Sequence, residues 1–405
     1  MSEVVNIPQL RFPEFSGEWE NEVVGNISNK VTDGTHDTPK PSSTGVPYIT
    51  AIHVKDGVID FDRCYYLSIE EHKKIYSRCN PEKNDILMVN IGAGTATTAL
   101  INIDYEFSLK NVALIKPNKL KSSSKFLVQS LRYKSGRLHH QLTSGGAQPF
   151  LSLKEIKRIK LNLPTKPEQQ KIADFLTAVD NKIEQLSKKQ ELLGEYKKGL
   201  MQQIFSQAIR FKADDGCDFP DWEEKSLGEL FNYKNGGSFE NEVVKDGLYN
   251  LITLNSITID GELKNEHKKI NSFDNSLKIN DLIMVLSDVA HGNFLGLTAI
   301  IPEDNSYVLN QRMGALKSKG LNNVVFLRLL INYNQKYFKL HGQGSSQQNL
   351  SKGDILKFEL LLPNRNEQQK IANFLSSIDT KIEQVGKQLD ESKQFKKALL
   401  QQMFV

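Results

Sequence analysis

The chain has 405 residues, of which 39% are hydrophobic and 25% charged, and its mean hydropathy is −0.42. These values are typical of a soluble globular protein with two or three domains. The start of the chain lacks a secretion signal and no apolar run reaches the roughly 18 residues of a membrane helix, so we expect a cytoplasmic protein.

The cysteines and the net charge limit the metal sites and the binding partners that we expect. Cys64, Cys79 and Cys217 form no Cys-x-x-Cys pair, which fits a reducing compartment and argues against a zinc site. A net charge of +4 permits a nucleic-acid partner without arguing for one.

Residues 1–162 are predicted to form an α+β domain. Short runs of β-forming residues, bounded by turn residues, alternate with few helical stretches. The predicted strands lie in Val46–Val54, Asp85–Ile91, Asn111–Pro117 and Ile159–Pro164, and a helix is expected near residues 123–142.

A long helix is predicted over residues 163–206. Its apolar residues recur at alternating steps of three and four over more than four heptads, which favours a coiled coil. About 38 residues at 1.5 Å each would give a rod of roughly 57 Å. The expected interface residues are Ile172, Leu176, Val179, Ile183, Leu186, Leu193 and Leu200.

The second half of the chain repeats this order, with an α+β domain at 207–361 and a second long helix at 362–405. Strands are expected in Asn250–Ile259, Asp281–Leu286, Gly296–Pro302 and Phe358–Pro363, and helix near 323–341. The expected interface residues of the second helix are Ile371, Leu375, Ile378, Ile382, Val385, Leu389 and Leu399.

The two helices are copies of one segment. Shifting the chain by 199 residues aligns Leu163–Phe205 with Leu362–Phe404 without a gap, with 22 of 43 positions identical. Two copies are too few for a solenoid, so a pseudo-twofold tandem repeat is expected. The matched apolar stripes favour pairing of one helix with the other; the alternative is that each helix packs only on its own domain.

Motifs of catalysis are scarce. The chain has no G-x-x-x-x-G-K-[ST] loop, and Gly92-Ala93-Gly94 is interpreted as a tight turn. Glu155 and Lys157 resemble the end of a nuclease motif, but no Pro-Asp precedes them at a suitable distance, so a surface charge pair is the better interpretation. We expect a binding protein with no catalytic residue and no metal ligand.

Polar loops rich in Gly, Thr and Asn follow equivalent predicted strands in both halves. Amide, hydroxyl and imidazole groups can read base edges, and lysine and arginine can neutralise phosphates. The alternative is that these loops are only solvated. The candidate DNA-binding residues are Thr35, His36, Thr38, Lys40, Thr95, Thr97, Lys110, Gln148, Lys234, Asp288, His291, Asn293, Arg312 and Gln347.

The helix motif P-x-x-x-E-Q-x-x-I-A-x-x-L-x-x-x-D-x-K-I-E, which ends in K-x-x-L-x-Q-x-[IM]-F, resembles the specificity (S) subunit of type I restriction-modification enzymes. The resemblance covers the whole length, as two target-recognition domains each followed by a repeated helix. Asp33–Pro39 and the G-x-x-Q-x-x-L-S segments Gly145–Ser152 and Gly344–Ser351 look like motifs of those domains. The second half has no obvious counterpart of the D-G-T-H sequence.

The resemblance implies an antiparallel coiled coil that separates two DNA-reading domains, and hence a bipartite target with a nonspecific gap. It also implies a role in phage defence and several partners: double-stranded DNA, two methyltransferase subunits that use S-adenosylmethionine, and restriction subunits that use ATP and magnesium. The alternatives left open are a coiled-coil adaptor that binds proteins without DNA specificity, and an enzyme of an unfamiliar type.

Overall fold

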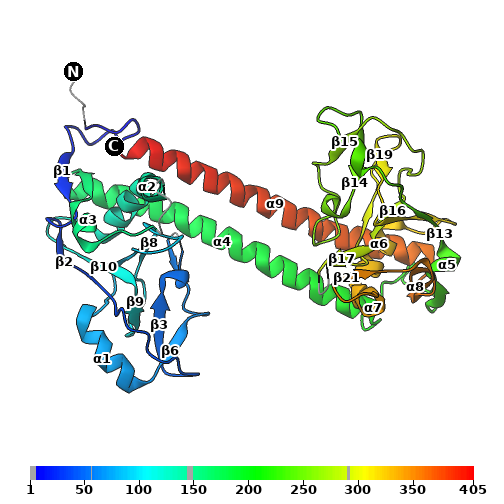
Figure 1. Cartoon of the computed structure of the whole chain (residues 1–405), viewed down its shortest axis with the longest axis horizontal. Coiled ribbons are helices and arrows are strands. Elements are labelled where there is room, and N and C mark those ends of the chain that lie inside the picture. The colour runs from blue at the N-terminus through cyan, green and yellow to red at the C-terminus, as the bar shows by residue number, and fades with distance from the viewer. Residues whose placement is uncertain (1–5, 56, 144–148, 290–291) are drawn as a thin grey trace. The chain divides into compact units, whose positions relative to one another are not determined.

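The computed structural model describes residues 6–55, 57–143, 149–289 and 292–405. The chain divides into two compact units (Figure 1): unit 1 is Met1–Lys189 together with Val385–Val405, and unit 2 is Gln190–Gln384. Each long helix therefore contributes one half to each unit. Within the described residues, no helix combines the length and the apolar character needed to cross a membrane.

Unit 1 is built on a four-stranded antiparallel sheet in the order β2-β10-β7-β8 and a three-stranded sheet in the order β6-β3-β9. Two further pairs, β1-β11 and β4-β5, complete it. The strands are β1 (Glu20–Val23), β2 (Ser28–Asp33), β3 (Val46–Thr50), β4 (Val54–Lys55), β5 (Val58–Ile59), β6 (Tyr65–Leu67), β7 (Ile86–Val89), β8 (Thr98–Leu100), β9 (Ser108–Lys110), β10 (Val112–Pro117) and β11 (Lys160–Leu163). The helices are η1 (Ala51–His53), α1 (Ile69–Cys79), α2 (Ser124–Thr143), α3 (Leu153–Arg158) and α4 (Lys166–Phe205).

Unit 2 repeats the same strand order, as β13-β20-β16-β18, β15-β14-β19 and β12-β22, and also contains the pair β17-β21. Its strands are β12 (Glu223–Ser226), β13 (Phe231–Asn235), β14 (Tyr249–Ile252), β15 (Lys268–Ile270), β16 (Leu282–Val285), β17 (Ser287–Val289), β18 (Thr298–Ile300), β19 (Tyr307–Leu309), β20 (Met313–Ser318), β21 (Gln347–Asn349) and β22 (Glu359–Leu362). The helices are α5 (Leu227–Leu230), η2 (Glu240–Glu242), η3 (Leu254–Ser256), α6 (Val324–Tyr333), α7 (Gln335–His341), α8 (Lys352–Leu356) and α9 (Arg365–Met403). The expected fold class, two α+β domains in tandem with long helices, is confirmed.

One difference between the two frames is α1. Its N-cap Ser68 accepts a hydrogen bond from the backbone of Glu71, so the helix begins at a capping residue that the sequence contains. In unit 2, residues 271–281 at the corresponding place form no helix or strand. The predicted helix near 123–142 is α2, whereas the one near 323–341 is divided into α6 and α7 at Asn334.

The Asn-Asp sequence that precedes both β7 and β16 forms a turn. Asn84 and Asn280 adopt the left-handed conformation, with φ of 73° and 68°, which asparagine tolerates better than most residues. The following aspartates close the turn, because Asp85 and Asp281 accept hydrogen bonds from the backbone of Glu82 and Lys278. Burial raises the pKa of both carboxyl groups, and a lysine opposes the shift in each unit.

The repeated Glu-Gln-Gln of the helices anchors each globular part to its helix. Glu168 is fully buried, and Arg11 donates to both of its carboxylate oxygens from Nε and Nη2, at 2.7 and 2.8 Å. The indole of Trp19 donates to the same carboxylate at 3.3 Å. The side chain of Gln169 bonds the backbone of Ser123 and Pro164, just before α2 and α4.

Unit 2 repeats this anchor at positions shifted by 199 along the helix. Glu367 is fully buried and accepts from Arg210 at 3.2 and 2.8 Å and from Trp222 at 3.1 Å. Gln368 bonds the backbone of Asn323 and Pro363. The identity of these residues in the two copies therefore follows from a buried polar site that must be fully satisfied.

Within each unit the two half-helices run antiparallel. In unit 1, Phe404, which directly follows α9, packs on Trp19 beside the start of α4, and Lys396 pairs with Asp180 at 2.5 Å further along. In unit 2, Lys197 pairs with Asp379 at 2.5 Å, and Phe205 at the end of α4 packs on Phe326.

The expected interface residues differ in burial. Ile172, Leu176 and Leu399 belong to the core of unit 1, and Ile371, Leu375 and Ile378 to that of unit 2. Leu186, Val385 and Leu389 are also buried, whereas Val179, Ile183, Leu193, Leu200 and Ile382 are partly exposed.

Candidate nucleic-acid interface

Strand register gathers the polar loops of unit 1 at one edge of its sheets. In the four-stranded sheet, Ala113 lies opposite Asp33 and Val112 lies opposite Val89. The end of β2, the start of β10 and the end of β7 therefore meet at the same edge. Edge here means the side of the sheet where these strands end, and does not mean an outer strand. The loops after β2 and β7, and the corner between β9 and β10, all leave the sheet there.

Three parallel segments leave this edge side by side. Lys110 at the end of β9 pairs with Thr50 of β3, and a parallel bridge joins it to Thr35 on its other side. The chain continues from these positions into the loop of residues 34–45, the corner at Asn111 and the short helix η1. We call this edge, with the loops that leave it, the loop edge of unit 1.

The candidate residues after β2 divide into buried and exposed members. Thr35 is only 4% exposed, and its hydroxyl accepts from the backbone of Asp37, so it holds the loop. The exposed His36 lies between Asn111 Oδ1 at 3.1 Å and Asp33 Oδ2 at 3.0 Å. Lys110 Nζ donates to Thr38 Oγ1. Lys40 is exposed.

The loops after β7 and before α3 lie together at the same edge. Ile91 bridges Phe150, and Leu151 donates its backbone N–H to Asn90. Thr95 is 2% exposed and donates its hydroxyl to Gly92 and Pro149, so its side chain holds the loops together instead of facing solvent. Thr97 is partly exposed, and Gln148 lies outside the described residues.

Unit 2 forms an equivalent edge from different residues. Asn235 lies opposite Gly314 and Val285 lies opposite Met313, as in the unit 1 register. Gly237 bridges Asn310 in parallel, just as Thr35 bridges Lys110. We call this the loop edge of unit 2.

This register corrects one expectation, because the D-G-T-H segment does have a structural counterpart in the second half. The four residues are Asn-Gly-Gly-Ser, from Asn235 to Ser238. A Cβ on Gly34 would lie 2.2 Å from the carbonyl oxygen of Leu109, and one on Gly236 would lie 1.9 Å from that of Asn310. Both positions therefore require glycine, and the Gly-Gly pair after a β-like run was the available sequence signal.

The candidate residues of unit 2 also divide by burial. Asp288 is 5% exposed and accepts from the backbone of Val289 and Phe294, both at 2.8 Å, so it organises its loop. Asn293 is exposed and accepts from Lys339 Nζ at 3.3 Å. Gln347 donates to Ser287 Oγ across the β17-β21 pair.

Two candidate cations of unit 2 are exposed. Arg312 lies at the loop edge with a left-handed φ of 72°. Lys234 lies on β13, and its Nζ is 3.4 Å from Asp274 Oδ1. His291 lies outside the described residues.

One arrangement in unit 1 resembles a catalytic triad. His72 lies between Ser108 Oγ at 2.9 Å and Glu106 Oε2 at 3.1 Å. Ser108 is 1% exposed within β9, so a substrate has no access to its hydroxyl. We therefore interpret this group as a structural contact between α1 and β9. Among the residues that the structure describes, no three His, Cys, Asp or Glu side chains form a metal-binding group.

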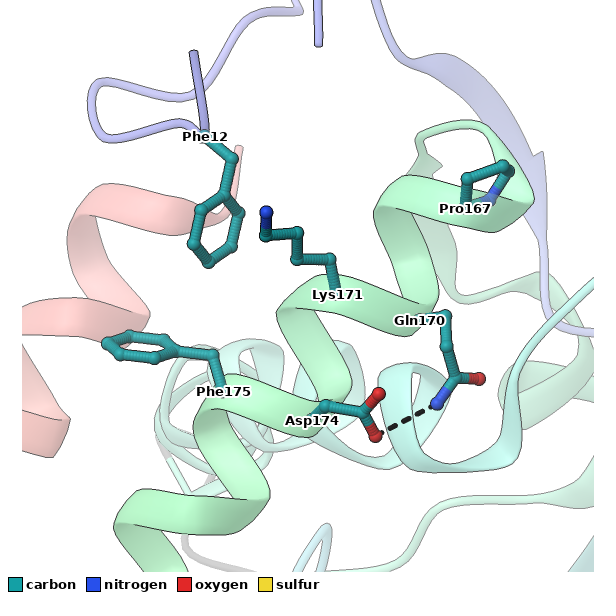
Figure 2. Close-up of a pocket in the computed structure, with 6 residues that line it drawn as sticks. All are labelled: Phe12, Pro167, Gln170, Lys171, Asp174 and Phe175. Atoms are coloured by element: carbon teal, nitrogen blue, oxygen red, sulfur yellow. Dashed lines mark hydrogen bonds between the residues drawn. The ribbon is translucent and has the colours of Figure 1, made fainter. Parts of the chain in front are cut away.

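A shallow groove of about 540 Å³ lies beside the start of α4 (Figure 2). Phe12 and Phe175 contact each other edge to face, and Lys171 extends over the ring of Phe12. Gln170 donates to Asp174 along the helix. This lining is mainly apolar and carries no catalytic arrangement.

Two copies of one α+β frame, each with a different polar edge, define a tandem recognition protein. A family model, the type I restriction modification DNA specificity domain, matches residues 17–193 and 220–391. The chain belongs to this family and carries two of its domains. DNA target recognition as a specificity subunit is the role that this membership gives it.

Two curated relatives come from Methanocaldococcus jannaschii. The MjaVIII type I restriction enzyme specificity subunit is 26% identical over 373 residues, which covers 87% of this chain and 84% of the relative. The putative MjaX type I specificity subunit is 25% identical over 413 residues, which covers 98% of this chain and 95% of the relative.

Two solved structures share the fold. The S subunit of a type I restriction-modification system from M. genitalium has a TM-score of 0.63 at 18% identity and covers 98% of this chain and 99% of its own. A chain from work on complex assembly and conformational transition of the type I R-M system has a TM-score of 0.55 at 15% identity, with 96% and 97% covered.

Proposed function

We propose that each loop edge reads one half of a bipartite DNA target, and that the chain positions partner enzymes on that DNA. The observation that carries this proposal is the duplicated edge: the same strands bring the same loops together in both units, while the side chains differ. A common frame with different polar side chains suits two readers of two different short sequences.

The long helices suit the role of a spacer between the two readers. With 40 and 39 residues, α4 and α9 are each about 60 Å long at 1.5 Å per residue. One turn of B-DNA is about 34 Å. Helices of this length therefore leave room for a nonspecific gap between the half-sites.

Partner subunits supply the chemistry in this proposal. Specificity subunits are non-catalytic, so two methyltransferase subunits would carry S-adenosylmethionine, and restriction subunits would carry ATP and magnesium. The helices support two equivalent docking sites, because they repeat exposed residues that no core requires. These are Lys182, Glu184 and Gln185 in α4 and Lys381, Glu383 and Gln384 in α9. We place this complex in the cytoplasm, where cellular DNA is accessible.

A domain replacement tests the two-reader arrangement. Residues 25–150 are replaced by the matching domain of another specificity subunit, and the methylated motif is read by sequencing modified bases in cells that carry the partner subunits. One half of the motif should change while the other half stays the same. A change in both halves, or a motif without two halves, would contradict the proposal.

Lengthening the helices tests the spacer. Insertion of one heptad after Gln190 and one after Leu389 keeps the apolar stripe in phase and adds about 10 Å to each helix. Because B-DNA rises 3.4 Å per base pair, the gap should grow by roughly three base pairs with unchanged half-sites. Intact methylation with an unchanged gap would show that the helices do not set the spacing.

Binding to duplex DNA separates this function from that of a protein adaptor. Affinity should fall steeply with salt, because phosphate contacts release counterions. The measurement uses the chain with and without co-expressed methyltransferase subunits. Salt-independent binding, or no binding by the assembled complex, would favour the adaptor.

A further inference from the structure

A short helical turn places one exposed residue at each loop edge. The turn η1 follows β3 in unit 1, and η3 follows β14 in unit 2. Both are closed in the same way: the Thr50 backbone donates to His53 Nδ1 at 3.0 Å, and the Thr253 backbone donates to Ser256 Oγ at 3.0 Å. The two turns are therefore equivalent.

The middle residue of each turn faces solvent between better-buried neighbours. Ile52 is 67% exposed, although the next residue, His53, is 3% exposed. In unit 2 the middle residue is Asn255, which is exposed next to Ser256 at 2%. The exposed side chain of Ile52 contributes little to the core, because most of its surface stays in water.

The turns lie beside the other segments of the loop edge. Thr50, the residue before η1, pairs with Lys110, which also bridges Thr35. In unit 2 the last residue of β14 pairs with Leu309, and the next residue, Asn310, bridges Gly237. A DNA duplex bound at either loop edge would meet the tip of its turn.

The chemistry of the tip differs between the two units. Isoleucine has no hydrogen-bonding group, and the apolar group that base pairs present in the major groove is the C5 methyl of thymine. Asparagine can bond adenine N6 and N7 with both ends of its amide. A second equivalent pair of exposed residues differs in the same way, with Phe150 in unit 1 and Asn349 in unit 2.

We propose that the middle residue of this turn is a specificity-determining residue, with Ile52 selecting a thymine in the half-site of unit 1 and Asn255 an adenine in that of unit 2. This inference rests on the proposed function. It adds a position to the candidate DNA-binding residues of the loops and names the base feature that each turn recognises.

The test uses the full chain assembled with its methyltransferase subunits and duplexes that carry its own motif. Deoxyuridine replaces thymine at one half-site position at a time, which removes only the C5 methyl. At one position the wild-type complex should lose affinity about fourfold, since one buried methyl(ene) group is worth about 0.8 kcal/mol. The Ile52→Ala complex should show no loss at that position.

Matched controls are available at the opposite edge. Leu120 follows the far end of β10 and is 89% exposed, and Leu321 follows the far end of β20 and is 76% exposed. Leu120→Ala and Leu321→Ala should retain the wild-type response to every base analogue.

In the second arm, 7-deazaadenine removes the N7 acceptor, and Asn255→Ala should abolish the response at one position of the other half-site.

Several results would overturn the inference alone. These are an intact bipartite motif with no thymine in the unit 1 half-site, or an Ile52→Ala complex that responds to deoxyuridine as the wild type does. A wild-type complex that yields no bipartite motif would instead refute the proposed function.

Discussion

Replacement of Arg11 by alanine should destabilise unit 1 strongly, because it leaves a buried carboxylate without its cationic partner. Glu168 is fully buried, and Arg11 provides two of the three hydrogen bonds that it accepts from described side chains. In Arg11→Ala the long contact from the Trp19 indole at 3.3 Å would remain of these three. A buried charge without its partner is costly because the protein interior does not replace the lost hydration.

The expected loss is about 3 kcal/mol of unfolding free energy, the lower end of the range for breaking a buried ion pair. We take the lower end because the Arg11 side chain is 13% exposed, so water can reach part of the site once it is removed. For a domain of 150–250 residues, each kcal/mol lost lowers the midpoint temperature of thermal unfolding by roughly 2–4 °C. Arg11→Ala should therefore lower that temperature by about 6–12 °C.

The chain has two tryptophans, Trp19 in unit 1 and Trp222 in unit 2, which allow the units to be followed separately. In a Trp222→Phe background, thermal unfolding followed by tryptophan fluorescence reports unit 1. Arg11→Ala is compared with Glu14→Ala in this background. Glu14 forms an exposed pair with Lys171, so its removal should leave the midpoint unchanged.

A double variant gives the sharper test. Replacing both Arg11 and Glu168 by methionine removes the pair together, so it should cost less than Arg11→Ala alone. The reasoning fails if Arg11→Ala shifts the midpoint no more than Glu14→Ala does, or if the double variant is the less stable of the two.

Three further predictions concern a loop, the helix pair and acidity. Gly34→Ala places a Cβ 2.2 Å from a carbonyl oxygen, so it should cost about 3 kcal/mol and disturb recognition of one half-site. Gly94→Ala has no neighbour closer than 3.8 Å and should leave the midpoint of thermal unfolding unchanged. Leu176→Ala, at a fully buried position of α4, should cost about 2–5 kcal/mol in urea unfolding, and a loss below 1 kcal/mol would contradict the helix packing. Burial lowers the pKa of His267, so the unfolded state binds its proton more readily and the stability of unit 2 should fall as the pH drops below about 6.5. His267→Phe should flatten that dependence between pH 7 and pH 5 in melts followed by Trp222, and an unchanged slope would exclude His267 as its source.

The long helices, the tandem repeat and the family could all be inferred from the amino-acid sequence. A heptad stripe is a local, periodic signal, so Ile172, Leu176 and their counterparts could be assigned to an inner face without knowledge of the partner. The Glu-Gln-Gln repeat also stood out in the sequence. The physical reason for this repeat could not be seen in the sequence, because the burial of Glu168 depends on Arg11 and Trp19, which lie far away in the chain.

Which residues meet at the loop edges depends on folding and could not be inferred from the sequence. Thr95 and Asp288 looked like contact residues in the sequence, but folding buries them and commits their oxygen atoms to hydrogen bonds within the loops. Ile52 carries no signal in a β-like run, and its exposure arises where the strand turns into η1. The counterpart of the D-G-T-H segment escaped sequence comparison for a similar reason. Backbone pairing and the absence of a Cβ define that place, and Asn235–Ser238 meets both conditions with almost none of the same side chains.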